Sequence, residues 1–189
     1  MQQSLVLLKP DCVQRRLVGA ITQRLEQKGL RLAALKLLQP GRDLAEKHYA
    51  VHKGKPFYES LVKFVTGGPV VAMVWQGPEA VTVIRNLMGP TDGTKAPPAT
   101  IRGDYAISIQ NNLVHGSDSA ENAATEIALW FKPEELVDYR PVDAPWVLGS
   151  CICLSHVYFR VTQSLLPAPA ARQPGLRPQC AGLRDHPRH

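Results

Sequence analysis

The chain has 189 residues, of which 44% are hydrophobic, and it carries a formal charge of +6. A chain of this length can bury one sizeable core, which predicts a single globular domain rather than two. Residues 1–147 hold 17 basic against 15 acidic side chains and residues 148–189 hold five against one. The excess charge therefore lies outside the predicted domain, and we expect no specific nucleic-acid partner.

The cysteines are distributed in a way that argues against disulfide bonding. Of the four, only Cys12 lies within residues 1–147, so that no disulfide framework is expected. The first residues enter an apolar run without the pattern of a secretion signal or of an arginine-rich leader. A reducing, cytoplasmic setting is the expectation that follows.

The first half of the chain alternates strand-like and helical patterns. Residues 4–8 form a short apolar strand, which is followed by a helix that Gly29 ends. The apolar positions of this helix recur every four residues, at Leu17, Ile21 and Leu25. Residues 30–38 form a second apolar stretch, and residues 44–65 predict two short helices that are separated at residues 54–56.

The second half continues the alternation. Residues 70–75 form a continuous apolar strand, and Gly77-Pro78 opens a helix that Gly89-Pro90 closes. An irregular loop is predicted up to residue 98, a last strand over residues 107–115 and a last helix over residues 120–131. The predicted core face of that helix contains Ala120, Ala123, Ala124, Ile127, Ala128 and Phe131. The order is βαββαβ, which predicts an α+β fold with a ferredoxin-like antiparallel sheet covered by helices.

The character of the chain changes near residue 147. Residues 148–166 are too polar for a membrane span, and the proline-rich residues 167–189 are predicted to be disordered. Cys151, Cys153, His156 and Cys180 do not have the spacing of zinc ligands. We therefore predict one domain over residues 1–147 and a non-globular extension over residues 148–189.

The segment 112–119, Asn-Leu-Val-His-Gly-Ser-Asp-Ser, places a histidine at the end of an apolar strand that leads into a helix. A nucleophilic imidazole needs a fixed ring and a partner that holds its tautomer, and Glu126, about two turns into that helix, can be this partner. Gly116 is predicted to leave room for a bulky substrate. In the alternative interpretation, His115 only satisfies a polar strand end and Glu126 is a solvated helix residue.

This segment resembles the active-site signature of nucleoside diphosphate kinases. Four other segments resemble the same family in the same order: Lys9-Pro10-Asp11, Gly68-Pro69-Val70-Val71-Ala72-Met73-Val74-Trp75, Thr100-Ile101-Arg102-Gly103-Asp104 and Trp130-Phe131-Lys132-Pro133-Glu134-Glu135-Leu136. The resemblance covers about residues 4–146 and implies the same ferredoxin-like fold. It also implies ping-pong transfer of a γ-phosphoryl group from a nucleoside triphosphate, typically ATP, to a nucleoside diphosphate through a phosphohistidine at His115.

The resemblance implies a role for each matched side chain. Lys9, Arg85 and Arg102 correspond to phosphate-contacting cations, with the hydroxyl of Thr91 beside them. Asn112 corresponds to a contact with the sugar hydroxyl and the phosphates, and Phe57 to a side chain that stacks on the base, with core packing as the alternative. Tyr49 corresponds to a tyrosine that reaches the histidine and the lysine, and Ser117 and Glu126 to the pair that positions the ring.

The resemblance further implies a metal ion and an assembly. Mg²⁺ would arrive with the nucleotide phosphates, because the sequence has no cluster of carboxylates for a protein cage, and Asp118 is the nearest candidate to touch it through water. The family forms homo-oligomers, so a hexamer or tetramer is expected. Three departures from the family pattern bear on loop shape: Cys12, Asp92-Gly93 and Ala99. The competing interpretation is a non-catalytic family member that acts as a binding or scaffold protein.

Overall fold

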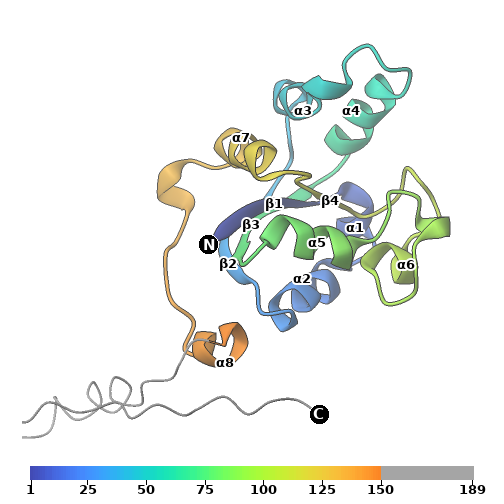
Figure 1. Ribbon diagram of the computed structural model, residues 1–189. Coiled ribbons are helices and arrows are strands. Elements are labelled where there is room, and N and C mark those ends of the chain that lie inside the picture. Colours follow the sequence, from blue (N-terminus) through green and yellow to red (C-terminus); the bar gives the residue numbers. More distant parts are fainter. Residues whose placement is uncertain (150–189) are drawn as a thin grey trace, which may run out of the picture. The chain divides into compact units, whose positions relative to one another are not determined.

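The computed structural model describes residues 1–149, which fold around one four-stranded sheet (Figure 1). In chain order the elements are β1 (Gln2–Leu8), α1 (Pro10–Gln14), α2 (Val18–Gln27), β2 (Arg31–Leu38), α3 (Arg42–His48), η1 (Ala50–His52), α4 (Tyr58–Thr66), β3 (Val70–Gly77), α5 (Ala80–Met88), η2 (Gly93–Lys95), α6 (Ile101–Tyr105), β4 (Val114–Gly116), α7 (Ala120–Trp130), η3 (Pro133–Glu135) and α8 (Ala144–Leu148). The predicted extension from residue 150 onward, including its cysteines and His156, lies outside the described residues. Within residues 1–149, no helix is long and apolar enough to cross a membrane.

The strand order of the sheet is β2-β3-β1-β4, and every neighbouring pair is antiparallel. This arrangement is the ferredoxin-like topology that the βαββαβ order predicts, so the predicted fold class is confirmed. The central strand β1 pairs Leu7 with Ala72 of β3 on one side and with His115 of β4 on the other. The short edge strand β4 is thereby fixed to a central strand of the sheet, whose residues from Ser4 to Leu8 are buried.

Both faces of the sheet are covered, which explains why β1 and β3 read as continuous apolar runs. Leu5 and Leu7 of β1 pack in a cluster with α3, α4 and α7, whereas Val6 and Leu8 pack in a second cluster with α2 and α5. Figure 1 shows these helices on opposite sides of the sheet. The core is therefore two apolar layers with the sheet between them.

The predicted strand over residues 107–115 is wrong for most of its length. Only Val114–Gly116 is a strand, and Ile107 and Ile109 are 88% and 64% exposed in an irregular segment. The strand cannot extend further back because Leu113 has a φ of +70°, in the left-handed region. Two contacts hold this residue, since its N–H donates to Asp11 Oδ2 and its carbonyl accepts from the Lys9 N–H.

The buried face of α7 also differs from the predicted one. Ala123, Ile127, Trp130 and Phe131 are buried, whereas Ala120, Ala124 and Ala128 are exposed. Alanine is small and only weakly apolar, so its periodicity discriminates poorly between the two faces of a helix. The large side chains at the end of the helix determine which face meets the sheet.

The first two departures from the family pattern have local explanations. Cys12 is fully buried, and this burial raises the pKa of its thiol to about 12. Asp92 accepts hydrogen bonds from the backbone N–H and the hydroxyl of Thr94, which caps η2. A Cβ on Gly93 would lie 2.6 Å from the carbonyl oxygen of Ala106, so only glycine fits there.

Ala99, the third departure, has a φ of +67°, a conformation that costs a side-chain-bearing residue about 1–2 kcal/mol. We expect Ala99→Gly to raise the free energy of unfolding by about 0.5–1 kcal/mol, because relief of this strain exceeds the added entropy of the unfolded chain. Ala96→Gly is the matched control, since Ala96 has an ordinary φ of −75° and glycine there should destabilise. Chemical denaturation measures both, and equal effects of the two substitutions would contradict the strain.

Candidate active site

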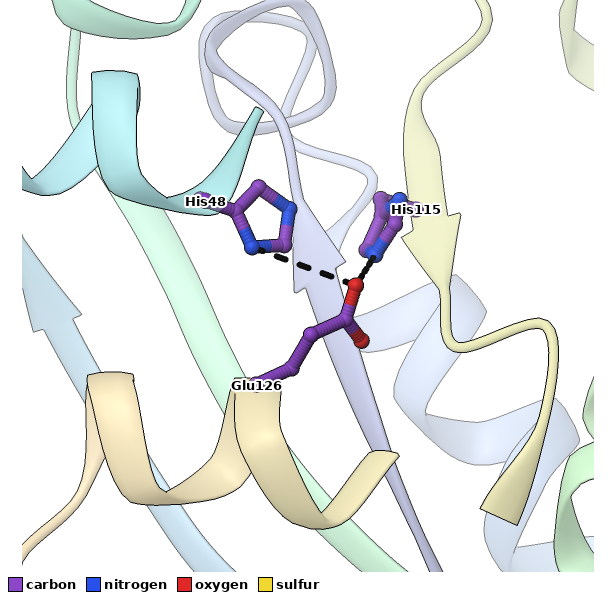
Figure 2. Close-up of side chains that lie close together, drawn as sticks. All are labelled: His48, His115 and Glu126. Atoms are coloured by element: carbon purple, nitrogen blue, oxygen red, sulfur yellow. Dashed lines mark hydrogen bonds and ion pairs between the residues drawn. The ribbon is translucent and has the colours of Figure 1, made fainter. Parts of the chain in front are cut away.

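His115 lies on β4, and its side chain is 25% exposed. Its Nε2 atom lies 3.0 Å from Oε1 of Glu126 on α7 (Figure 2). An ionised carboxylate can only accept, so Nε2 carries the proton and Nδ1 keeps its lone pair. Among residues 1–149, Nδ1 of His115 has no hydrogen-bond partner. The ring is thus held by one nitrogen and leaves the other for a substrate.

Ser117 fixes the carboxylate from behind. Its hydroxyl accepts from the N–H of Leu5 at 3.1 Å and donates to Oε2 of Glu126 at 2.5 Å. Burial by itself would raise the pKa of Glu126, but the hydrogen bonds from His115 and Ser117 outweigh it and hold that pKa below its usual range. Glu126 is therefore an anion with both oxygens engaged.

His48, which no sequence pattern singled out, lies beside this pair. Its ring packs edge-to-face against the His115 ring at a centroid distance of 4.6 Å, and its Nδ1 lies 4.0 Å from Glu126 Oε1. The indole N–H of Trp130 donates to that Nδ1 at 3.2 Å. Burial, reinforced by the neighbouring His115, lowers the pKa of His48 to about 3. His48 is therefore a neutral imidazole.

Tyr49 follows His48 and is buried. Its ring centroid lies 6.4 Å from that of His115, but its hydroxyl has no hydrogen-bond partner among the described residues. The ring of Tyr49 thus reaches His115, but its hydroxyl makes no hydrogen bond to the histidine or to Lys9. Burial raises the pKa of this hydroxyl above its usual range, which keeps it a donor.

His115 opens into a cavity of about 700 Å³, a usual size for a small-molecule site. The cavity brings together nearly all side chains that the sequence singled out, namely Lys9, Tyr49, Phe57, Arg85, Thr91, Arg102, Asn112, His115, Asp118 and Glu126. Ser117 alone is absent from the lining, because it lies behind Glu126. Three basic side chains around one imidazole make the cavity suited to an anionic ligand.

Lys9 and Asn112 form a fixed pair on one wall. Lys9 Nζ donates to Asn112 Oδ1 at 2.6 Å, and the Asn112 amide donates to the carbonyls of Thr91 and Ile109. Burial, together with the charge of Arg102, lowers the pKa of Lys9 to about 8. The pair ties β1 to the loop that carries Thr91.

Arg102 is only 7% exposed, and its guanidinium binds backbone before any ligand is present. It donates to the carbonyls of Gly89, Asn112 and Val114, at 2.8, 3.3 and 2.7 Å. A guanidinium has five N–H donors, so two remain for the cavity. Arg85 differs, since it is exposed and its side chain has no hydrogen bond within residues 1–149.

Phe57 and Gly116 are the two remaining residues for which the sequence predicts a role at the site. Phe57 is 48% exposed on the cavity lining, 5.5 Å from the His52 ring, which excludes the alternative that it packs in the core. Gly116 lies on the cavity lining beside His115. A Cβ there would lie 2.7 Å from Sδ of Met88, so the glycine also makes room for α5.

Comparisons with known proteins cover most of the described residues. The family model of nucleoside diphosphate kinase matches residues 2–136, which include every residue of the cavity. The chain belongs to the nucleoside diphosphate kinase family. A nucleoside diphosphate kinase of Carboxydothermus hydrogenoformans is 53% identical over 147 residues, 78% of this chain and 99% of its own length. That of Thermomicrobium roseum is 52% identical over 149 residues, 79% of this chain and its full length.

Solved structures of nucleoside diphosphate kinases are also similar to this chain. The halophilic enzyme from Halobacterium salinarum, in complex with CDP, is 47% identical with a TM-score of 0.76, and the match covers 77% of this chain and 97% of that one. A family protein from Babesia bovis is 46% identical with a TM-score of 0.76, over 78% of this chain and 99% of that one. Both matches cover about the length of the folded region described here.

In this member of the nucleoside diphosphate kinase family, possible ligand atoms of His48, His115 and Glu126 lie within 4.8 Å of one another. Such a cluster can hold a metal ion, but the hydrogen bonds argue against it. Nδ1 of His48 already accepts from Trp130, so its proton must be on Nε2, and neither nitrogen offers a free lone pair. The three side chains are therefore better described as a hydrogen-bonded cluster than as a metal centre.

Proposed function

We propose that this chain transfers the γ-phosphoryl group of a nucleoside triphosphate to a nucleoside diphosphate through a phosphohistidine at His115. One observation supports this most directly: the His115 ring is bonded to Glu126 through Nε2 and opens into a cavity with three cations. Family membership supports the reaction class.

The proposed reaction has two steps. In the first, the Nδ1 lone pair attacks the γ-phosphorus, the bond to the bridging oxygen breaks, and the nucleoside diphosphate leaves with that electron pair. In the second, a β-phosphate oxygen of another diphosphate attacks the phosphohistidine and restores His115. The Nε2–H keeps its bond to Glu126 throughout, which stabilises the positive charge that the ring acquires on phosphorylation.

The other cavity residues have positioning and charge roles in this proposal. Lys9, Arg85 and the two remaining N–H groups of Arg102 bind phosphate oxygens, with the Thr91 hydroxyl beside them. Asn112 contacts the sugar and phosphate side, and the unpartnered hydroxyl of Tyr49 donates to the transferring group or accepts from Lys9. The positions of these side chains around the cavity, together with the family resemblance, support these roles.

Mg²⁺ is the proposed cofactor, bound by the nucleotide phosphates and not by a protein cage. The donor set fits this arrangement, because both oxygens of Glu126 are engaged, whereas Asp118 is exposed on the cavity lining. Asp118 would hold a water of the ion. Bound in this way, the ion neutralises phosphate charge.

Phe57 is proposed to stack on the nucleotide base. Phe57→Ala should raise KM for purine and pyrimidine nucleotides by similar factors, because stacking contributes on the order of 1 to 3 kcal/mol and every base has a π-face. Phe57→Tyr, which keeps the ring, is the control and should leave KM nearly unchanged. Steady-state kinetics with four diphosphate acceptors measures this, and a loss confined to purines would contradict it.

Lys9 gives the proposed reaction an alkaline limit. The pKa of Lys9 is lowered to about 8, and the protonated form binds phosphate, so kcat/KM for the nucleotide should fall as the pH rises through about 8. A Lys9→Arg variant keeps its charge over this range and should lose the alkaline limb. A pH–rate profile from pH 6 to 10 measures this, and an unchanged limb in the variant would assign it to another group.

The decisive test of the function combines two assays on the full chain. Incubation with ATP and CDP should give CTP and ADP in equal amounts, and a scaffold protein would give neither. Parallel reciprocal lines in initial-rate plots would identify the ping-pong order. Intersecting lines would require a ternary complex and would overturn the phosphohistidine route.

Assembly, domain extent and location are proposed on separate grounds. A homo-oligomer, hexameric or tetrameric, is supported by the edge strand β2, where Leu35 and Leu37 are 50% and 64% exposed.

Residues 1–147 are proposed to suffice for transfer, because relatives of about that length match over nearly their whole sequence. The cytoplasm is the proposed setting, which suits the free thiol of Cys12.

A further inference from the structure

Two imidazoles lie close to one carboxylate oxygen in this site. Oε1 of Glu126 is 3.0 Å from His115 Nε2 and 4.0 Å from His48 Nδ1, and Figure 2 shows it between the two rings. The other oxygen of Glu126 is engaged by Ser117. An N–H on Nδ1 of His48 would therefore compete with His115 for Oε1, and a small rotation would bring it into hydrogen-bond range.

Trp130 prevents that competition. An indole nitrogen can only donate, so the Trp130 N–H at 3.2 Å requires an unprotonated Nδ1 on His48. The neutral His48 must then carry its proton on Nε2, which has no partner among the described residues. The Trp130 bond is thus the one contact within residues 1–149 that selects the tautomer of His48.

The packing makes this donor rigid. Trp130 is 4% exposed at the end of α7, in the same apolar cluster as Ile127, and its ring lies edge-to-face against His48 at 5.6 Å. Glu126 is on the same helix, one turn earlier. Residues four apart lie on the same face of a helix, so α7 presents both the carboxylate of Glu126 and the indole N–H of Trp130 to His48.

Protonation of His48 is opposed from several sides. Glu126 on α7 favours the charged form, whereas His115 on β4, His52 on η1 and Lys9 after β1 oppose it, as does burial. Tyr49, which packs edge-to-face on His48, is kept neutral by its own burial. The neutral ring is the relevant species at physiological pH, so the competition with His115 is decided by the tautomer and not by charge.

We propose that Trp130 is a positioning residue that acts as a tautomer lock on His48: the indole N–H keeps the proton off Nδ1 of His48 and so reserves Glu126 for His115. The inference rests on the proposed function of His115 as nucleophile. Without the lock, His48 would turn to its Nδ1–H form and donate to Glu126. His115 would then lose the partner that keeps its own proton on Nε2 and its lone pair on Nδ1.

Trp130→Phe tests the lock, because it keeps an aromatic ring and removes the N–H. Trp75→Phe is the matched control, since Trp75 is fully buried in the other apolar cluster and its indole N–H has no partner within residues 1–149. We expect kcat/KM to fall about tenfold in Trp130→Phe and less than twofold in Trp75→Phe. Circular dichroism melts of both variants show that they are folded at the assay temperature.

A double variant separates the lock from packing. In Trp130→Phe/His48→Phe, position 48 has no nitrogen that could compete for Glu126, so kcat/KM should recover to within threefold of the unmodified chain. If the double variant stays as impaired as Trp130→Phe, or if Trp75→Phe loses as much activity, the loss comes from packing and the proposal is overturned.

Imidazole ¹⁵N chemical shifts test the lock without using activity. The unmodified chain should show His48 protonated on Nε2, and Trp130→Phe should show it protonated on Nδ1. An unchanged tautomer in that variant overturns the lock even if transfer is active. Absence of transfer by the unmodified chain, with the tautomers as stated, would instead overturn the proposed function.

Discussion

Replacement of His115 by glutamine is expected to abolish both phosphoryl transfer and labelling of the chain by ATP. The proposed intermediate stores the phosphoryl group on Nδ1, and the glutamine amide has no nucleophilic lone pair to replace it. The amide N–H can still donate to Glu126, so the carboxylate keeps a partner and the fold should persist. We expect kcat/KM to fall by about 10³-fold or more.

The label itself provides the sharpest measurement. ATP radiolabelled at the γ-phosphate, without an acceptor, should label the unmodified chain on one histidine, and acid should release that label. His52→Gln is the control, because His52 lies on the same cavity lining but makes no contact with Glu126, and it should keep the label. Acid-labile label on His115→Gln would show that another group is the nucleophile.

The parts of the fold that the sequence predicts are those whose pattern is local. The continuous apolar strands β1 and β3 and the amphipathic α2 and α5 follow directly from periodicity and from the glycines and prolines around them. The failure at residues 107–113 has a distant cause. Asp11 and Lys9 hold Leu113 in a left-handed conformation from about 100 positions away, and no window of sequence contains that contact.

The candidate site likewise has one part that the sequence predicts and one part that it does not. Its side chains could be named from the sequence because they lie in recognisable segments, and the pairing of His115 with Glu126 spans only one strand end and about two helical turns. The arrangement behind them could not be predicted. His48 and Trp130 are 82 positions apart and meet only through the packing of α3 against α7. The three carbonyls that Arg102 binds likewise come from two separate segments, the end of α5 and residues 112–114.

Those three carbonyls lead to the second large expected effect. Arg102→Ala should lower the free energy of unfolding by about 2 kcal/mol or more, because the carbonyls of Gly89 and Val114 lose their donor and each such loss costs about 1–3 kcal/mol, whereas the Asn112 carbonyl still accepts from the Val114 N–H. The carbonyls of Gly89, Asn112 and Val114 flank the cavity and the strand of His115, so the loss loosens the site as well as the fold. kcat should fall too, since the remaining guanidinium donors are placed to stabilise charge on the transferred group.

Arg85→Ala distinguishes the contribution of Arg102 to stability from its contribution to catalysis. The Arg85 side chain lies on the same cavity but is exposed and has no hydrogen bond among the described residues. Its removal should therefore lower kcat/KM for the nucleotide and leave the free energy of unfolding within about 0.5 kcal/mol of that of the unmodified chain. Arg102→Lys adds a second comparison, because a lysine keeps the charge but cannot reach three carbonyls at once. Urea denaturation and steady-state kinetics on the three variants measure both quantities. If Arg102→Ala were as stable as Arg85→Ala, the three backbone bonds would contribute little, and Arg102 would act on the phosphates alone.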